Sequence, residues 1–264
     1  MTRLRISMEA HVTGYLEVNG IRLYHEIYGT GEPLVLIHGG AGSIQFDFRE
    51  TIIRLQERFL MIGIDLQNHG RSDHREEPET FEQDAKDIVA LLDLLGIPKA
   101  CFFGFSNGAT TALEIAKIYP DRVVKIVAAS GVYKRSGLIP GFFQAMEQAT
   151  IDNMPTYLKE NFLKLNSNID ELHNMFQKDS QRMIHFEDWK DRDMQHIKNP
   201  VLLIYGDRDV VTVTHAATIS QLLPDARLCI LPATHGGYMM ADESGIVDEE
   251  LITFTVSQIA RFLE

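Results

Sequence analysis

Short, uninterrupted apolar runs recur along this chain, and segments with helical spacing separate them. A run without polar alternation is typical of a strand buried on both faces, as the strands of a parallel sheet are. Strands that alternate with helices predict a mostly parallel central sheet with helices on both faces, which is an α/β fold. The clearest runs are PLVLIH at 33–38, FLMIGIDL at 59–66, ACFFGF at 100–105, VKIVAAS at 124–130 and VLLIYG at 201–206.

The segments between these runs have the spacing of amphipathic helices. In residues 80–95 apolar side chains recur at i, i+3, i+4 and i+7 from Ile88 to Leu95, and Gly96 ends the pattern. The same reasoning predicts a final strand over 227–231 and further helices from the N-cap residue Ser43 to about Arg58, from the turn at Ser106 to Tyr119, and over 214–223 and 246–263.

Two β-type segments near the start flank the dipeptide Asn19-Gly20. They are YLEV at 15–18 and IRLYHEIY at 21–28. Asn-Gly between such segments is a strong hairpin signal, because both central residues of the turn need positive φ. We therefore expect an antiparallel hairpin at one edge of the sheet.

Residues 134–195 interrupt the alternation of strands and helices. They contain no convincing strand and resemble several helices joined by polar turns. The alternation resumes after Pro200 with the same strand type, which favours one sheet over two separate domains. The sequence therefore predicts one α/β core domain, residues 1–133 and 196–264, with a helical insertion at 134–195.

Composition narrows the classes of function. The 264 residues include 25 basic and 37 acidic ones, a formal charge of −12, which argues against a nucleic-acid partner. The sequence contains neither an 18-residue apolar stretch nor the apolar core of a signal peptide. Membrane insertion is therefore not expected, and a cytoplasmic location is expected. The only cysteines, Cys101 and Cys229, lie in apolar runs that predict buried thiols. Neither a metal nor an organic cofactor is predicted, and a homo-oligomer is left open.

The segment GFSNG at 104–108 matches the pattern G-x-S-x-G. It follows a predicted buried strand and opens a predicted helix. At such a junction the serine is held in a strained backbone conformation that exposes its hydroxyl, and the glycines avoid collisions with the neighbouring strand and helix. Ser106 is therefore a candidate nucleophile.

A serine nucleophile needs a base, and the base needs a group that orients it. YGDRD at 205–209 and the segment THGG at 234–237 each follow a predicted strand, at the same edge of the sheet as Ser106. His235 is the candidate base. Asp207 and Asp209 are both candidates for the orienting acid.

Five segments together resemble the α/β-hydrolase fold family over the chain from about Tyr15 to the C-terminus. The resemblance implies that the acid is Asp209, three residues after the strand-end glycine, and that Asp207 accepts hydrogen bonds from backbone donors of its turn. The segments are LIHGG at 36–40, DLQNHGRSD at 65–73, GFSNG at 104–108, IYGDRD at 204–209 and THGG at 234–237.

The resemblance also implies an oxyanion hole, two backbone N–H groups that stabilise the charge of the tetrahedral intermediate. These would belong to Asn107 and to Gly40 in the loop HGGAG, with Ala41 as the next choice for the second donor. His38 is expected to order that loop, since one imidazole suffices for proton transfer. In the structural turn, His69 and Asp73 are given structural roles, and Asn68 stands where the family often has glycine.

The insertion at 134–195 corresponds to the helical lid of the family. It is rich in aromatic residues and contains five methionines, Met146, Met154, Met175, Met183 and Met194. Such side chains line adaptable apolar pockets. The expected substrate-binding residues are Ala41, Phe105, Phe142, Met146 and Trp189.

The resulting prediction is a serine hydrolase that cleaves a small, largely neutral carboxylic ester or lactone through an acyl-enzyme. Ser106 favours acyl transfer, because haloalkane dehalogenases and epoxide hydrolases of the family carry aspartate at that position. A C–C bond hydrolase or a perhydrolase is an alternative. The C–C hydrolase is the weaker of these two, because such enzymes often carry G-N-S-x-G-G. In this chain Phe105 stands in place of the asparagine and Ala109 in place of the last glycine. A binding or receptor module for small molecules is the second alternative.

Overall fold

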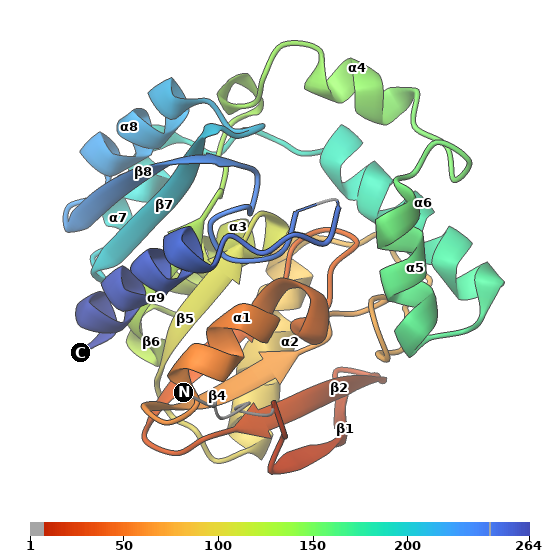
Figure 1. Ribbon diagram of the computed structural model, residues 1–264, viewed down its shortest axis with the longest axis horizontal. Helices are drawn as coiled ribbons and strands as arrows, with labels where there is room; N and C mark the ends of the chain where they lie inside the picture. Colours follow the sequence, from red (N-terminus) through yellow and green to blue (C-terminus); the bar gives the residue numbers. More distant parts are fainter. Residues whose placement is uncertain (1–7, 243) are drawn as a thin grey trace.

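The computed structural model describes residues 8–242 and 244–264, and its strands form one eight-stranded sheet (Figure 1). Their spatial order is β1-β2-β4-β3-β5-β6-β7-β8. The pairings from β4 to β8 are parallel, and those of β1 with β2 and of β2 with β4 are antiparallel. The α/β fold predicted from the sequence is therefore confirmed. The bounds are β1 (Val12–Val18), β2 (Ile21–Tyr28), β3 (Glu32–Ile37), β4 (Phe59–Ile64), β5 (Ala100–Phe105), β6 (Val123–Ala129), β7 (Val201–Arg208) and β8 (Ala226–Thr234).

The hairpin of β1 and β2 forms one edge of the sheet, as predicted. Its turn residues Asn19 and Gly20 have φ values of 48° and 91°. These positive values are the ones that a two-residue turn between right-twisted strands requires. The first strand begins at Val12, three residues before the predicted start.

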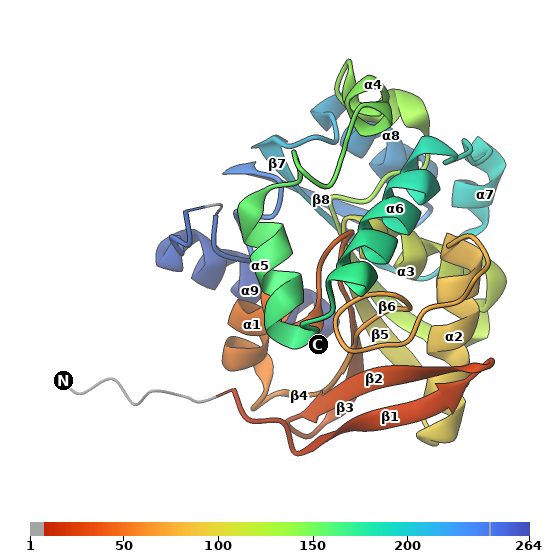
Figure 2. The same ribbon diagram turned by 90° about the vertical axis from the view of Figure 1, so that its right-hand side faces the viewer.

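Helices cover both faces of this sheet (Figures 1 and 2). Helices α1 and α9 pack on one face, and α2, α3, α7 and α8 pack on the other. The bounds are α1 (Ile44–Leu55), α2 (Phe81–Leu94), α3 (Asn107–Ile118), α4 (Phe142–Glu147), α5 (Thr156–Leu165), α6 (Ile169–Ile184), α7 (Asp191–His196), α8 (Val213–Leu222) and α9 (Glu249–Leu263).

The helix ends follow local hydrogen bonds. Ser43 caps α1, as predicted, by accepting the N–H of Phe46. The last helix was expected from residue 246, but α9 begins at Glu249, because Asp248 is its N-cap and accepts the N–H of Leu251.

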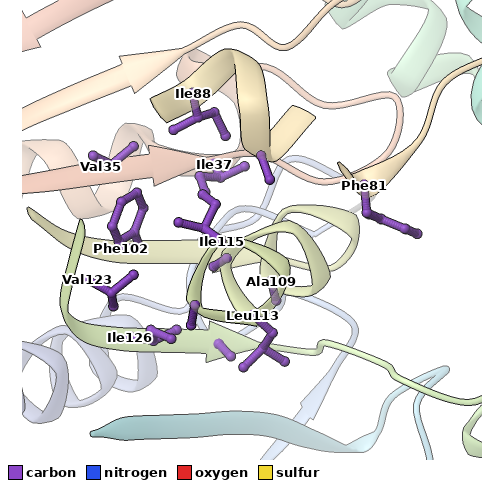
Figure 3. Packing of buried hydrophobic residues seen from close by; sticks show 14 of the residues in the cluster. Val35, Ile37, Phe81, Ile88, Phe102, Ala109, Leu113, Ile115, Val123 and Ile126 are labelled. Atoms are coloured by element: carbon purple, nitrogen blue, oxygen red, sulfur yellow. The ribbon is translucent and has the colours of Figure 1, made fainter. Parts of the chain in front are cut away.

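The central strands, β3 to β7, are largely buried on both faces, as their solid apolar runs predicted, whereas the edge strands β1 and β8 are partly exposed. Figure 3 shows the side on which α2 and α3 pack, where Ile88 and Leu113 face Val35, Phe102 and Ile126 of the sheet. All five side chains are completely inaccessible to solvent. This packing holds the carboxyl ends of the parallel strands in a common, rigid edge.

Helices α4, α5 and α6 lie beyond that edge, whereas α7 does not (Figure 1). Met194 of α7 and Ile197 after it are fully buried in the large core cluster, where α7 packs against α3 and α8. The structure therefore groups α7 with the core, although the predicted insertion extends to residue 195. The physical reason is that the apolar side of this short helix is covered by the core.

The two glycines around Ser106 lie against backbone atoms, and we expect alanine to be severely destabilising there. A Cβ on Gly108 would lie 2.0 Å from the carbonyl oxygen of Ile37, and one on Gly104 would lie 2.1 Å from that of Gly108. Gly108→Ala should lower the free energy of unfolding by about 3 kcal/mol or more, since backbone has to move.

The matched control is Gly14→Ala, because a Cβ on this half-buried strand glycine would meet nothing within 4 Å. Urea unfolding of both variants measures the effect. Equal midpoints for Gly108→Ala and Gly14→Ala would contradict the steric argument.

Candidate active site

Ser106 occupies a sharp turn between β5 and α3. Its backbone angles are φ 53° and ψ −119°, a region that residues with a side chain rarely adopt. The N–H of Ser106 donates to the carbonyl oxygen of Ala129 on β6 at 2.8 Å, which holds the turn against the sheet. The strained serine that the G-x-S-x-G pattern predicted is confirmed.

Three side chains from separate loops form one hydrogen-bonded chain at the carboxyl edge. Nε2 of His235, which follows β8, lies 3.1 Å from Oγ of Ser106. Nδ1 of His235 lies 2.6 Å from Oδ1 of Asp209, which follows β7. An ionised carboxylate accepts only, so the proton of this pair is on Nδ1 and Nε2 is left as an acceptor for the serine hydroxyl.

The surroundings of Asp209 keep its carboxylate ionised. Burial raises the pKa of Asp209, but hydrogen bonds from His235, Ser130 and Val211 outweigh burial and hold the pKa below its ordinary value. Ser130 Oγ donates to Asp209 Oδ2 at 2.5 Å and lies 2.6 Å from the hydroxyl of Tyr238. The sequence analysis missed Ser130. Its position at the end of the VKIVAAS strand was the available signal.

The structure separates the two candidate acids. Asp209 contacts His235, whereas Asp207 is exposed and its Oδ1 accepts the N–H of Ala233 on β8 at 3.0 Å. Asp207 thus accepts from a backbone donor, but this donor belongs to β8 and not, as the sequence had suggested, to the turn of Asp207.

Gly40 and Asn107, the residues of the predicted oxyanion hole, line one cavity together with Ser106. Asn107 is the first residue of α3, so its N–H has no partner inside the helix. Within residues 8–242 and 244–264, neither this N–H nor that of Gly40 has a hydrogen-bond acceptor. The preceding N–H, of Gly39, donates to Asp47 Oδ2 at 2.7 Å and holds the loop.

His38 orders the same loop, as expected. Its Nε2 accepts the N–H of Leu66 at 2.9 Å, and its Nδ1 lies 2.7 Å from the carbonyl oxygen of Gly39. Both nitrogens are satisfied by a neutral ring. Complete burial and the nearby His69 lower the pKa of His38 to about 3.

This buried imidazole should make stability depend on pH. The pKa of an unfolded histidine is about 6.5, so the unfolded state binds the proton first. The stability that neutral His38 contributes is therefore complete above pH 6.5 and declines as the pH falls toward about 3. At pH 5.0 the loss should be about 2 kcal/mol.

His38→Gln is the matched reference, because glutamine can accept the Leu66 N–H without titrating. Between pH 7.5 and 5.0, the free energy of unfolding of the wild type should decline by about 2 kcal/mol more than that of the variant. Urea titrations at both pH values give this difference. Parallel declines would show that His38 does not titrate in this range.

The cavity next to Ser106 has a volume of about 330 Å³ and mostly apolar walls. Of the predicted substrate-binding residues, the structure places Ala41, Phe142 and Met146 on its wall. Met154, Met175 and Met183 also line it, whereas Met194 is buried in the core with α7. The apolar set of the insertion is thus divided between the cavity and packing.

Phe105 and Trp189, two predicted pocket residues, do not line this cavity. The ring of Phe105 is buried and packs on His235, with ring centroids 4.8 Å apart. The indole ring of Trp189 lies under the ammonium of Lys117 on α3, 4.1 Å from the centroid, and the Trp189 backbone N–H donates to Tyr133. Neither residue is on the wall of this cavity, and their part in substrate binding stays a prediction.

Asn68, the departure from the family turn, joins α6 to the core. Its φ is 64°, a conformation that asparagine tolerates better than most residues. Asn68 Nδ2 donates to Glu79 and Asn68 Oδ1 accepts from Asn174 of α6, both at 2.8 Å. His69 and Asp73 have structural contacts in the same turn, as expected: the Nδ1 of His69 lies 2.9 Å from Gln67 O, and Asp73 accepts from Arg22.

A carboxylate of α6 also lines the cavity, and the sequence analysis did not select it. Asp179 Oδ1 accepts from Asn107 Nδ2 at 3.2 Å and forms an ion pair with Arg182. The i, i+3 spacing of Asp179 and Arg182 was visible in the sequence, but their burial was not.

In the described part of the chain, no group of three His, Cys, Asp or Glu side chains is arranged to hold a metal ion. None of the described helices combines the length and apolar character needed to span a membrane.

Comparison with known proteins agrees with the fold. A family model described as the alpha/beta hydrolase fold matches residues 32–161. A putative non-heme haloperoxidase of Mycobacterium phage D29 is 34% identical over 132 residues, 48% of this chain and 47% of the phage protein. A putative carbamate hydrolase of Azorhizobium caulinodans is 26% identical over 229 residues, 78% of this chain and 84% of that protein. The solved structure of a meta-cleavage product hydrolase from Pseudomonas fluorescens IP01 has a TM-score of 0.75 at 21% identity, covering 94% and 96% of the two chains.

The sheet topology, the strained serine turn after β5 and the matching family model together define a hydrolase of the alpha/beta class. The chain has the alpha/beta hydrolase fold, and the match to a model of that family over residues 32–161 agrees with the resemblance found in the sequence. The match to the phage protein spans less than half of that protein's length, and likeness to the solved structure at 21% identity concerns the fold alone. The bond cleaved and the substrate therefore depend on the chemistry of this site.

Proposed function

We propose that this protein is a serine hydrolase that cleaves a small, largely neutral carboxylic ester or lactone through an acyl-enzyme. The observation that supports this most strongly is the hydrogen-bonded chain Ser106–His235–Asp209, at 3.1 and 2.6 Å, beside a cavity of about 330 Å³. A nucleophile, a base and an orienting acid in this order are what acyl transfer requires.

In the proposed reaction, Oγ of Ser106 attacks the carbonyl carbon while Nε2 of His235 takes the hydroxyl proton. The N–H groups of Gly40 and Asn107 stabilise the oxyanion, each contributing about 3 kcal/mol. The tetrahedral intermediate expels the alcohol, which takes the proton from Nε2, and leaves the acyl group on Ser106. Water, deprotonated by His235, then attacks the acyl carbon, and Ser106 regains its proton as the acid leaves.

The proposed substrate class follows from the cavity. Its walls are mostly apolar, and among the described residues that line it none is Lys or Arg. A substrate carboxylate would therefore lose its hydration without gaining a cationic partner. This disfavours an acyl group that carries a carboxylate and favours one of a few carbons without such a charge.

A panel of substrates tests the proposal against the reactions named for the relatives. It contains p-nitrophenyl esters of two to eight acyl carbons, a γ-lactone, an aryl carbamate, a dienone ketoacid as a C–C substrate, and acetate with hydrogen peroxide for perhydrolysis. We expect the highest kcat/KM with a short ester or the lactone. Preferred turnover of the dienone ketoacid, the carbamate or peroxide would replace the ester assignment. Tight ligand binding without turnover of any substrate would favour a binding module.

A further inference from the structure

The cavity beside Ser106 contains one carboxylate that the proposed reaction does not use. Asp179 reaches the cavity wall from α6, and its side chain is 13% exposed. A Cβ on Gly40 would lie 2.5 Å from Asp179 Oδ2 and 2.9 Å from Asn107 Nδ2. The carboxylate therefore lies beside Gly40 and the side chain of Asn107, the two residues whose backbone N–H groups are the proposed oxyanion donors.

The two oxygens of Asp179 have different surroundings. Oδ1 accepts from Asn107 Nδ2 and from Arg182. Oδ2 has no hydrogen-bond donor among the described residues, and His69 Nε2 lies 3.9 Å from it, beyond hydrogen-bond distance. That nitrogen is buried and also lacks a partner within the described chain. A polar group of a ligand can therefore be accommodated at Oδ2.

Asp179 is held in place as an anion. Burial raises the pKa of Asp179. Arg182 and His69 lower it by more than burial raises it, and they keep the pKa well below its ordinary value. Arg182 is itself fixed by Asp84 at 2.8 Å, so the ion pair is anchored to α2 as well as α6. The two nearby cations limit the repulsion between Asp179 and an oxyanion, while Oδ2 stays available to accept a hydrogen bond.

We propose that Asp179 determines acyl specificity: it accepts a hydrogen bond from an N–H or O–H group carried next to the reacting carbonyl and excludes acyl groups with a carboxylate there. The inference rests on the proposed function and adds the substrate class, esters of α-amino or α-hydroxy acids. An ionised carboxylate within a few ångströms attracts an ammonium group and repels an anion. Even in a moderately polar cavity, each effect should change kcat/KM by about tenfold or more.

The test uses four benzyl esters with one skeleton, CH3–CH(X)–CO–, in which X is methyl, hydroxyl, ammonium or carboxylate. They are the esters of isobutyric acid, lactic acid and alanine and the monoester of methylmalonic acid. Release of benzyl alcohol gives kcat/KM for the wild type and for Asp179→Asn. For each protein, the kcat/KM of an ester is divided by that of the isobutyrate ester. The ratio for the wild type is then divided by the ratio for the variant, and this double ratio does not depend on the intrinsic reactivity of the ester.

We expect this double ratio to be at least about tenfold in favour of the wild type for alaninate, and about tenfold in the opposite direction for methylmalonate. The lactate ratio should change less, because the amide oxygen of asparagine still accepts a hydrogen bond. Asp170→Asn is the matched control, since it removes one charge from an exposed position of the same helix and should leave all ratios unchanged.

Unchanged ratios in Asp179→Asn, with Ser106-dependent hydrolysis of isobutyrate intact, would overturn this inference and leave the proposed function standing. If none of the four esters is hydrolysed in a Ser106-dependent way, both fall. If Asp179→Asn does not fold, the wild-type rates relative to the hydroxide rates of the same esters decide. Methylmalonate turnover equal to that of isobutyrate would then overturn the inference, and a tenfold deficit would support it.

Discussion

Ser106→Ala is expected to lower kcat for the best ester by about 10⁴-fold or more and to abolish covalent labelling by a fluorophosphonate. Alanine removes the attacking oxygen, and His235 then has no hydroxyl to deprotonate at the 3.1 Å contact. Residual hydrolysis would come only from the proposed oxyanion donors and from binding, as in other serine hydrolases without their nucleophile. Initial rates with a short p-nitrophenyl ester and mass spectrometry of the labelled protein measure both effects.

Ser257→Ala is the control for this substitution. Ser257 is exposed on α9, where its hydroxyl donates to the carbonyl oxygen of Phe254 and accepts from the side-chain amide of Gln258. Its rate and labelling should match the wild type. Equal labelling of Ser106→Ala and wild type would remove Ser106 as the nucleophile, and the proposed function would fail with it.

Asp209→Asn should lower kcat by about 10³- to 10⁴-fold near neutral pH. The carboxylate of Asp209 accepts from Nδ1 of His235 at 2.6 Å and would stabilise the imidazolium formed during attack. An amide at this position carries no charge, and its NH2 group favours the histidine tautomer that has the proton on Nε2. That nitrogen then cannot accept the proton of Ser106.

Asp207→Asn, two residues away, is a closely matched control. The asparagine oxygen can still accept the N–H of Ala233, so we expect a change in kcat of less than about threefold. Thermal unfolding of both variants checks that each is folded. A large loss in Asp207→Asn with little loss in Asp209→Asn would reverse the assignment of the acid.

The helices and strands could be predicted because their signals are local. A solid apolar run must be covered on both sides, and the Asn19-Gly20 turn needs positive φ at both residues. The glycines at 104 and 108 belong to the local pattern G-x-S-x-G, although the carbonyl group that excludes a side chain at Gly108 belongs to Ile37 on β3. Parallel strands end at one edge, so Ser106, Asp209 and His235 could be placed together before their contacts were known.

The contents of the cavity could not be predicted in the same way. Phe105 and Trp189 are as apolar as Phe142 and Met146, yet only the second pair lines the cavity. Which face of a helix or loop turns toward Ser106 depends on how α4 to α7 pack, and that packing is the sum of many weak, distant contacts.

The sequence by itself therefore determined the α/β sheet, the serine turn and the edge at which the reacting groups meet, because each depends on residues that are close along the chain. Only the tertiary structure decided that Asp209 contacts His235, that Ser130 supports it and that Asp179 lies beside the oxyanion loop. The two hydrogen bonds to Asp209 join residues that lie 26 and 79 positions apart along the chain. Such contacts form only once the packed core and the helices above it have brought these segments together.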